Sequence, residues 1–422
     1  MTPILAISYD APPRLTGHSI STTKALAALQ AFAPEIVLDV LCASAGEDVS
    51  SDEKLEDLLP ETLRIHRIDP FPRGRQTILQ RIIGGQGGWQ NAAVQKAAAL
   101  FPAEHKKPAL IYSRSHPPAS NLVALDLVNG PFRGVPWVAY FNEPWSGNTF
   151  YKSPVTRAAL GRYERQIFET ATELIFATDA LRDAMLAGAE PEILAKAHVI
   201  PPAFHPDWYG KAELPVLFRQ IRPAGKVIAH VGDLHPYRSP AKLYEAIAAL
   251  SKQHADLAAK LHFWQIGEMD ESFVNLEREH GVAGNVQLFS PVSYLESLAV
   301  MKAADVLLLI DSPVRRSVFL PSKLVDYLGA RKPILGLTPK GSYCARLLES
   351  WGQPWCDITQ NDALTALLKR IAAGEIWAPP PESVLADYTF EATGKKRAGI
   401  LTRCLANTHV ADVRGSDEDT QP

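Results

Sequence analysis

A lysine and an aspartate three residues apart form the pattern in this chain that best suits the binding of an anion. Lys323 and Asp326 belong to the run Pro321-Ser322-Lys323-Leu324-Val325-Asp326-Tyr327. Pro321 and Ser322 predict a helix start, with Ser322 as the cap. Both charged residues then lie near the helix N-terminus, whose partial positive charge and open N–H groups suit a phosphate or a ribose-linked anion. The alternative is an ordinary connection between a helix and a strand.

A second possible phosphate site follows the apolar run at residues 226–231. Gly232 and Asp233 come directly after this predicted strand, and Arg238 precedes a predicted helix at 240–254. A strand, a glycine-containing loop and a helix N-terminus form a phosphate site in many α/β folds. The guanidinium of Arg238 can bind phosphate oxygens bidentately, and Lys323 could supply a second charge. The alternative for Arg238 is a solvated loop cation.

Polar residues also follow predicted strands in the first half of the chain. The strand at 137–141 delivers Asn142, Glu143 and Trp145 to its carboxyl end. A carboxylate such as Glu143 could accept a hydroxyl proton there, or it could cap a loop or pair with an arginine. His18 and His116 stand in loops after two other strands and are possible bases, with a solvated loop histidine as the alternative for each.

These residues need elements to position them, and alternating strand-like and helical segments predict parallel α/β domains. Prolines concentrate near residues 201–223 and predict a linker, since proline interrupts regular structure. The expected strands are residues 4–8, 36–42, 110–113, 137–141, 174–177, 198–200, 226–231, 261–267, 286–289 and 306–310, and one from 334. The expected helices are 22–32, 120–128, 154–170, 180–186, 240–254, 271–280, 294–303, 322–330, 341–350 and 362–373.

The domain division follows from this alternation. We expect an N-terminal Rossmann-like domain at 1–205, a linker at 206–225 and a second Rossmann-like domain at 226–385. A helix at about 386–406 is expected to pack back on the first domain. The polar, acidic stretch at 408–422 predicts a disordered tail.

Composition excludes several classes of protein. With 422 residues the chain has room for two domains, and a net charge of -3 argues against a general nucleic-acid binder. The four scattered cysteines favour reduced thiols over disulfides or a zinc site. No apolar run is long enough for a bilayer, and the N-terminus is typical of a first strand, not of a signal peptide. We therefore expect a cytoplasmic protein, with any membrane contact peripheral.

A basic stretch at residues 71–107 is the place where such contact is expected. It has six basic residues against Glu104, and apolar residues that include Trp89 interleave with them. It could lie on an anionic membrane surface at the inner face of the cell membrane. A solvated helix face explains it equally well.

The run at 319–336 resembles the nucleotide-sugar motif of the group-1 (family four) glycosyltransferases of the GT-B fold. The resemblance is strong over about 226–336 and diffuse over the first half. It implies two Rossmann-like domains facing across a cleft, with a nucleoside-diphosphate sugar on the second domain and the acceptor on the first. It also implies that Asp326 touches the ribose. The first carboxylate of the family's pair falls on Val318, and Asp233 replaces one of two usual basic residues.

The resemblance assigns further roles. Gly267 and Val292, at or just after the carboxyl ends of the strands at 261–267 and 286–289, would lie near the nucleotide base, and the backbone around Ser322 would meet the sugar. Gly17 would let its loop approach the donor phosphate. The implied acceptor-side residues are His18, His116, Asn142 and Trp145. The implied catalytic residues are Arg238 and Lys323, which would stabilise the departing diphosphate, and Glu143.

The motifs that are absent narrow the reaction class. No DxD follows a strand in the body of the chain, no GxGxxG follows the first strand, and no GxxxxGK[ST] occurs. These absences argue against a metal-dependent GT-A transferase, a dehydrogenase and a P-loop kinase, and no metal-ligand cluster is visible. We expect a metal-independent enzyme of hexosyltransferase type that needs no cofactor, with retention of anomeric configuration implied by the resemblance alone.

Three functions remain open at this level. The first is transfer of a sugar from a nucleoside-diphosphate sugar to a glycan or glycolipid acceptor, in cell-surface polysaccharide or glycolipid synthesis. The second is a nucleotide-sugar epimerase of the same fold. The third is a non-catalytic sugar-nucleotide-binding scaffold protein, which the residues Val318 and Asp233 favour. Turnover separates the third from the first two, and product identity separates those from each other.

Overall fold

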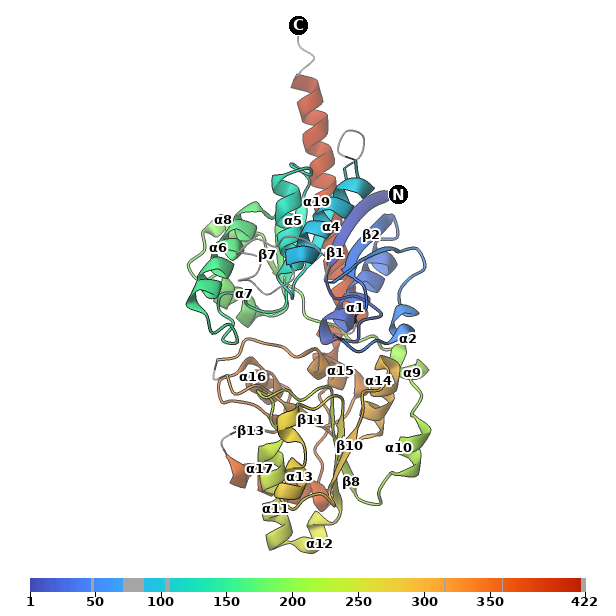
Figure 1. Cartoon of the computed structure of the whole chain (residues 1–422), viewed down its shortest axis with the longest axis vertical. Helices are drawn as coiled ribbons and strands as arrows, with labels where there is room; N and C mark the ends of the chain where they lie inside the picture. The colour runs from blue at the N-terminus through green and yellow to red at the C-terminus, as the bar shows by residue number, and fades with distance from the viewer. Residues whose placement is uncertain (47–48, 71–86, 103–106, 315, 359, 419–422) are drawn as a thin grey trace. The chain divides into compact units, whose positions relative to one another are not determined.

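The computed structural model describes the chain except residues 47–48, 71–86, 103–106, 315, 359 and 419–422 (Figure 1). The chain forms two compact units, one of Met1–Ala203 with Phe390–Pro422 and one of Phe204–Thr389. The predicted linker at 206–225 falls inside the second unit. It contains two short helices, α9 (Trp208–Lys211) and α10 (Val216–Gln220), with Pro215 directly before α10.

The first unit is built on a seven-stranded parallel sheet with the strand order β3-β2-β1-β4-β5-β6-β7. Its central strands are buried on both faces, so they are continuous apolar runs that the sequence reveals. The strands are β1 (Thr2–Ser8), β2 (Ile36–Ala43), β3 (Arg64–Ile68), β4 (Leu110–Arg114), β5 (Trp137–Phe141), β6 (Glu173–Phe176) and β7 (Ala197–Val199). The helices are α1 (Gly17–Phe32), α2 (Glu53–Glu56), α4 (Gly87–Leu100), α5 (Ala119–Asn129), α6 (Pro154–Thr170), α7 (Asp179–Met185), α8 (Pro191–Ala195) and α19 (Phe390–Glu418).

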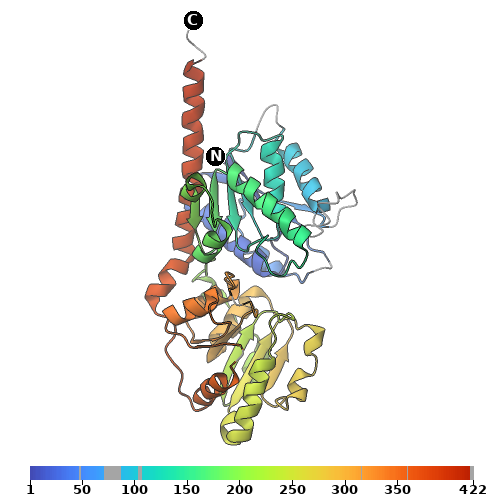
Figure 2. The ribbon, with the colours of Figure 1, turned by 90° about the vertical axis from the view of Figure 1, so that its left-hand side faces the viewer.

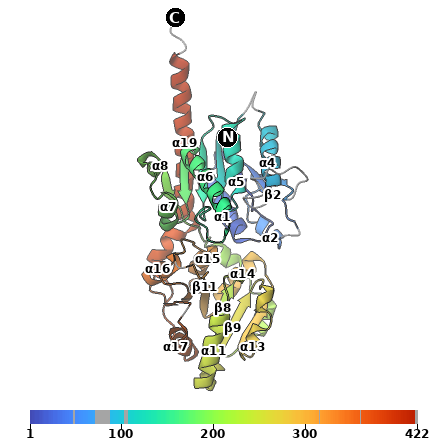
Figure 3. The same cartoon turned by 60° about the vertical axis from the view of Figure 1, so that its left-hand side comes forward.

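The second unit repeats this plan with six parallel strands in the order β10-β9-β8-β11-β12-β13. Figure 3 shows β8, β9 and β11 of this sheet. The strands are β8 (Lys226–Val231), β9 (Leu261–Ile266), β10 (Val286–Phe289), β11 (Val306–Ile310), β12 (Ile334–Leu337) and β13 (Trp355–Cys356). The helices are α11 (Ala241–Gln253), α12 (Ala255–Ala258), α13 (Leu276–Glu279), α14 (Tyr294–Ala303), α15 (Ser322–Ala330), α16 (Tyr343–Ser350), α17 (Asn361–Ala372) and α18 (Glu382–Leu385), with 3₁₀ turns η1 (Glu271–Phe273) and η2 (Ala386–Tyr388). Two Rossmann-like sheets were predicted, and the topology confirms them.

Strand order reverses direction once in each sheet, between β1 and β4 and between β8 and β11. Loops leaving neighbouring strands at such a point diverge to opposite faces, which leaves room for a ligand at the carboxyl ends of the strands. The loops after β1 and β4, and those after β8 and β11, therefore flank the places in the two sheets where a ligand can fit.

The last helix returns the chain to the first unit. α19 packs along α1 (Figure 2). The rings of Phe32 and Phe390 lie 5.8 Å apart, and Leu401 is fully buried. The sequence predicts a helix ending near 406 and a disordered tail from 408, but α19 continues to Glu418. No proline interrupts this stretch, and a single glycine costs a helix only about 1 kcal/mol.

Three other local predictions need correction. The predicted helix at 271–280 is broken, because Asn275 adopts a left-handed conformation between η1 and α13. Ser322 is the first helical residue of α15, and the cap position belongs to Pro321, which makes no side-chain cap bond. β3 and α4 were not predicted, because β3 is a polar edge strand and α4 is rich in alanine.

The basic stretch at 71–107 lies largely outside the described residues. Within its described part, Trp89 is fully buried and meets the ring of Tyr9 at 5.1 Å, so this residue belongs to the core and not to a membrane-facing surface. All four cysteines are buried thiols, as the sequence predicts. Over the residues that the structure describes, no helix combines the length and apolar character needed to cross a bilayer.

Candidate functional site

Lys323 and Gly232 meet at the switch point of the second sheet. Gly232 leaves the end of β8 with a φ of +128°, and Lys323 is the second residue of α15. A Cβ added to Gly232 would stand 2.5 Å from Nζ of Lys323. The side chain of Lys323 therefore lies directly against the bare Gly232 backbone, and only glycine gives both this conformation and this space.

The buried His230 contacts the ammonium group of Lys323. Nζ of Lys323 lies 3.1 Å from Nε2 of His230, and Nδ1 of His230 lies 2.9 Å from the carbonyl oxygen of Leu308. A carbonyl can only accept, so Nδ1 carries the hydrogen and Nε2 accepts from Lys323. Burial first, and then the charge of Lys323, lower the pKa of the fully buried His230 well below its ordinary value, so it is neutral.

The charge around Lys323 is mostly positive. Lys323 is partly exposed, and burial, followed by the charge of Arg238, lowers its pKa to about 7, while Asp233 acts in the opposite direction. Arg238 is partly exposed in the same loop, and His235 beside it has a lowered pKa for the same two reasons, burial first. Two cations that repel each other form a positively charged region whose chemistry suits an anion.

The end of β9 packs tightly against this loop. Gly267 has a φ of +131°, and a Cβ there would meet the carbonyl carbon of Gly232 at 2.6 Å. Nε2 of Gln265 donates to the oxygen of Gly232 at 2.9 Å, and the backbone N–H of Glu268 donates to Oδ1 of Asp233 at 2.9 Å. Asp233, which replaces an expected basic residue, thus ties the two loops together. Val292 lies partly exposed in the loop before α14.

Asp326, the residue predicted to touch a ribose, is buried beneath two tyrosines. It is 3% exposed, and its Oδ1 accepts from the hydroxyl of Tyr294 at 3.0 Å. Its backbone oxygen accepts from the hydroxyl of Tyr209 at 2.6 Å. Burial, and then the charge of Asp326, raise the pKa of both tyrosine hydroxyls well above the ordinary value, so both donate. Ser322 lies partly exposed one turn earlier.

Asp311 is a neighbour of this site that the sequence reasoning missed. It follows β11 directly, is 3% exposed, and accepts from the Thr338 hydroxyl at 2.8 Å and the Ser312 N–H at 2.8 Å. Burial raises its pKa even though the charge of Arg238 opposes the shift. An aspartate directly after an apolar strand next to the switch point was the signal that could have revealed it.

Four of the residues predicted in the first half come together at the carboxyl ends of its strands. Nδ1 of His18 lies 2.7 Å from the amide nitrogen of Asn142, its Nε2 lies 3.6 Å from Oε1 of Glu143, and its ring lies 5.7 Å from that of His116. Burial lowers the pKa of His116. The hydroxyl of Tyr151, which the sequence reasoning missed, lies 3.3 Å from Nε2 of His116.

Trp145, predicted with the acceptor contacts, is instead fully buried in the first unit. Its indole N–H donates to Oγ of Ser115 at 2.8 Å, and its ring packs on Phe141 at 5.4 Å. Its backbone N–H donates to Oε1 of Glu164 at 2.9 Å, and burial raises the pKa of that carboxyl. Trp145 and Glu164 thus form the support of the turn that carries Glu143.

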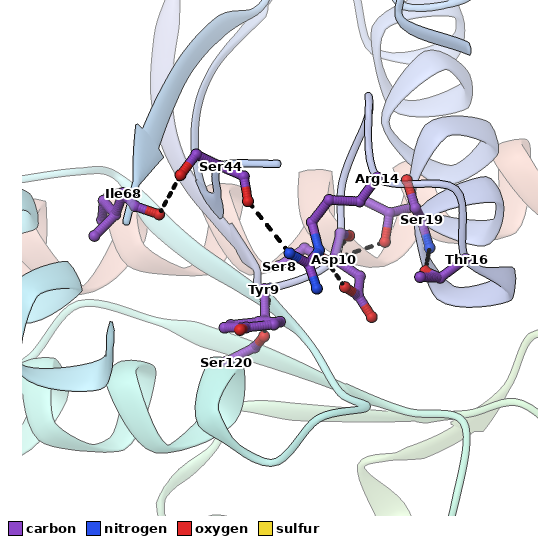
Figure 4. A network of polar contacts seen from close by, with 10 residues as sticks. Ser8, Tyr9, Asp10, Arg14, Thr16, Ser19, Ser44, Ile68 and Ser120 are labelled. Atoms are coloured by element: carbon purple, nitrogen blue, oxygen red, sulfur yellow. Dashed lines mark hydrogen bonds and ion pairs between the residues drawn. The ribbon is translucent and has the colours of Figure 1, made fainter. Parts of the chain in front are cut away.

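The loop after β1 is fixed by an ion pair (Figure 4). Nε of Arg14 lies 3.0 Å from Oδ1 of Asp10, and both side chains are nearly buried. Arg14 also donates to the carbonyl of Ser44 at 3.2 Å and covers the ring of Tyr9 at 5.2 Å. Gly17 follows as the exposed first residue of α1, whose N-terminus Thr16 caps. The sequence reasoning quoted this loop but did not single out Asp10 or Arg14.

Within the described parts of the two units, no group of three histidine, cysteine or acidic side chains is arranged to hold a metal ion. No protein-family model matches the chain, and no curated protein matches it in sequence.

Solved structures do resemble it over almost its whole length. HepE of Anabaena, solved with UDP and glucose, is 15% identical with a TM-score of 0.61, and the match covers 99% of this chain and 100% of that one. The lipopolysaccharide glycosyltransferase WaaG is 16% identical with a TM-score of 0.59, over 94% of both chains. A protein of Listeria monocytogenes described as a UDP-N-acetylglucosamine 2-epimerase is 11% identical with a TM-score of 0.60, over 99% of this chain and 97% of that one. At these identities the likeness shows the fold: the chain has the GT-B fold, with two Rossmann-like units, of these glycosyltransferases.

Proposed function

We propose that the protein is a glycosyltransferase that binds a nucleoside-diphosphate sugar on its second unit and transfers the sugar to a glycan or lipid-linked acceptor. The observation that carries this proposal is the placement of Lys323 against the bare backbone of Gly232, with Arg238 in the same loop. Two cations at the carboxyl ends of parallel strands, beside the N-terminus of α15, suit a diphosphate. HepE, which shares the fold, was solved with UDP and glucose.

The proposed chemistry is electrostatic. When the bond between the sugar and the diphosphate breaks, negative charge grows on the departing diphosphate. Lys323 and Arg238 would stabilise that charge in a partly dry site, where the interaction is stronger than in water. Side chains would then supply the positive charge that a metal ion supplies in other transferases, so we propose a metal-independent reaction. Retention of configuration is part of the proposal only through the family resemblance.

In the first unit, Glu143 is the proposed acceptor-side group. Its carboxylate faces His18, whose ring is held by the amide of Asn142, and His116 completes the cluster. A carboxylate beside two imidazoles can orient an acceptor hydroxyl and accept its proton. We further propose that the acceptor belongs to cell-surface polysaccharide or glycolipid synthesis and that the reaction takes place in the cytoplasm. Contact with an anionic membrane stays a proposal that rests on the basic stretch at 71–107.

Binding of nucleotide sugars tests the proposal. The panel is UDP-glucose, GDP-mannose and dTDP-glucose, titrated calorimetrically into the wild-type chain without metal. We expect one of them to bind, and Lys323→Met or Arg238→Ala to weaken that binding by about 10- to 150-fold, the value of one hydrogen bond to a charged group. Lys252→Met, an exposed lysine in the last turn of α11, is the control and should bind as the wild type does. Unchanged affinity in both site variants would refute the assignment of this site.

The likeness to the Listeria protein described as an epimerase supports a second candidate. An epimerase would convert the nucleotide sugar with no acceptor present and release no nucleoside diphosphate. A transferase would release nucleoside diphosphate in proportion to glycosylated acceptor. Binding with neither product would identify a scaffold protein.

A further inference from the structure

We infer that His230 is a positioning residue that holds the ammonium group of Lys323 over Gly232 and thereby sets the pH above which binding of the donor diphosphate declines. The inference rests on the proposed function, because it concerns the same anion site. It adds His230 and a pH dependence of binding. Neither the motif at 319–336 nor the likeness to other GT-B structures provides them.

The geometry gives His230 this role. It lies near the end of β8, is wholly buried, and has one ring nitrogen on the Leu308 carbonyl and the other on Nζ of Lys323. The bond to Leu308 fixes the ring and its tautomer, which leaves Nε2 with a lone pair directed at the ammonium. Without that acceptor, the end of a four-carbon side chain would have no fixed place.

The pH dependence follows from the groups around Lys323. Burial is the main cause that lowers the pKa of Lys323, Arg238 lowers it further, and Asp233 opposes the shift. The pKa of His230 is lowered well below its ordinary value, so His230 is neutral, and burial also lowers the pKa of His235. Asp311 at the end of β11 faces Arg238 and offsets part of that charge. The resulting pKa of Lys323, about 7, means that the site without ligand exchanges this proton near neutral pH.

The sign is determined by linkage. A diphosphate favours protonated Lys323, so its pKa rises on binding. Below about pH 7 the proton is already in place and affinity is constant. Above that pH each unit costs up to about tenfold in affinity, until the pKa of the bound state is reached. The diphosphate of a nucleotide sugar does not gain or lose a proton near neutral pH. The midpoint of the decline in affinity therefore reports on a group of the protein.

The test is the affinity for UDP-glucose, GDP-mannose and dTDP-glucose from about pH 6 to 9, by calorimetry on the full chain. In the wild type we expect a decline that begins near neutral pH. Lys323→Arg, which stays charged, should remove the decline. His230→Leu removes the acceptor and should move the midpoint to lower pH. The Leu308 carbonyl keeps a hydrogen-bond donor in that variant, because the Tyr327 hydroxyl donates to it at 3.1 Å.

Two further variants keep the test decisive if His230→Leu does not fold. His230→Asn keeps a donor for the Leu308 carbonyl but is too short to reach Lys323, so it should lower the midpoint as well. Tyr327→Phe removes a different buried bond to the same carbonyl and should leave the midpoint unchanged.

The outcomes separate the inference from the proposed function. If Lys323→Met binds as tightly as the wild type at about pH 6, or if no sugar nucleotide binds, the proposed site is wrong. If Lys323→Met weakens binding but the His230 variants keep the wild-type midpoint, the positioning role of His230 is wrong and the proposed function stands.

Discussion

At the scale of single residues, the absence of a side chain at Gly232 leaves space for the ammonium group of Lys323. Gly232 has no side chain, Lys323 fills the space beside it, and His230 holds the lysine from the protein interior. The three residues depend on one another: only glycine gives both the positive φ and the space, and burial of the Lys323 ammonium costs free energy that its contact with His230 partly offsets.

Gly232→Ala tests this arrangement. The added Cβ would push Nζ of Lys323 from its place and would force alanine into a positive φ, so we expect a loss of about 1–3 kcal/mol in stability and weaker binding of the nucleotide sugar. Gly281→Ala is the matched control in the same unit, because its φ is +68° and its Cβ would meet nothing within 4 Å. The control should lose about 1–2 kcal/mol of stability and keep its affinity. Equal affinity in both variants would contradict the account.

Asp311 gives a prediction on pH and stability. Because burial raises its pKa, the folded chain binds this proton more tightly than the unfolded chain. Stability is therefore lost as the pH rises from the ordinary value of 3.8 to the raised one. Asp311→Asn keeps an acceptor for the Ser312 N–H and should remove that loss, so urea unfolding should favour the variant increasingly as the pH rises above the ordinary value of 3.8. A difference in stability that stays constant as the pH rises would contradict this prediction.

At the scale of elements, turns and helix ends bring the polar residues together. The turn after β5 carries Glu143, and Glu164 of α6 fixes it by accepting from the backbone of Trp145 and Ser146 and from the Ser146 hydroxyl. The placement of Glu143 therefore depends on a residue about twenty positions away in sequence.

Glu164→Ala should show this dependence. It leaves two backbone N–H groups without their acceptor, and we expect a loss of about 2–4 kcal/mol in the free energy of unfolding. Glu164→Gln retains an acceptor oxygen and should lose less than half as much. Glu169→Ala, exposed on the same helix, should change stability by no more than about 0.5 kcal/mol. Thermal unfolding of the three variants is the measurement, and equal losses would exclude the role of Glu164.

Elements of this kind also define what sequence can predict. Strands such as β1, β5 and β8 are apolar runs buried on both faces, and their periodicity and flanking loops predicted them. The sequence also placed His18, Glu143 and His116 after strands of the first sheet, although it did not predict that the three side chains meet. The inward turn of Trp145, the burial of Asp326 under Tyr294 and the contact of His230 with Lys323 depend on side-chain packing across elements distant in sequence, which no local pattern encodes.

At the scale of the whole molecule, the chain divides unequally between its two units. The second unit is one continuous segment, 204–389, with its own core, which includes Leu243, Phe263 and Leu308. The first unit needs both ends of the chain, because α19 supplies Leu401 and the buried Arg397. The predicted return of the last helix reflects this division.

Fragments test it. The segment 204–389 should fold alone and bind the nucleotide sugar, because Lys323 and Arg238, the two cations proposed to hold the diphosphate, both lie within it. The segment 1–203 should be unstable without α19, since losing even one fully buried leucine side chain costs about 1.5–3 kcal/mol. Circular dichroism and calorimetry on both fragments provide the readout. A stable 1–203 fragment would contradict the structural role of α19. A folded 204–389 fragment without affinity for the nucleotide sugar would contradict the assignment of donor binding to the second unit.

The central claim is that a diphosphate binds between Lys323 and Arg238 at the bare backbone of Gly232. The most direct test is a crystal structure of the full chain with the nucleoside diphosphate whose sugar derivative binds in calorimetry. The account predicts phosphate oxygens within about 3 Å of Nζ of Lys323 and of the guanidinium of Arg238. A diphosphate bound elsewhere, with the Lys323 ammonium still held only by His230, would contradict it.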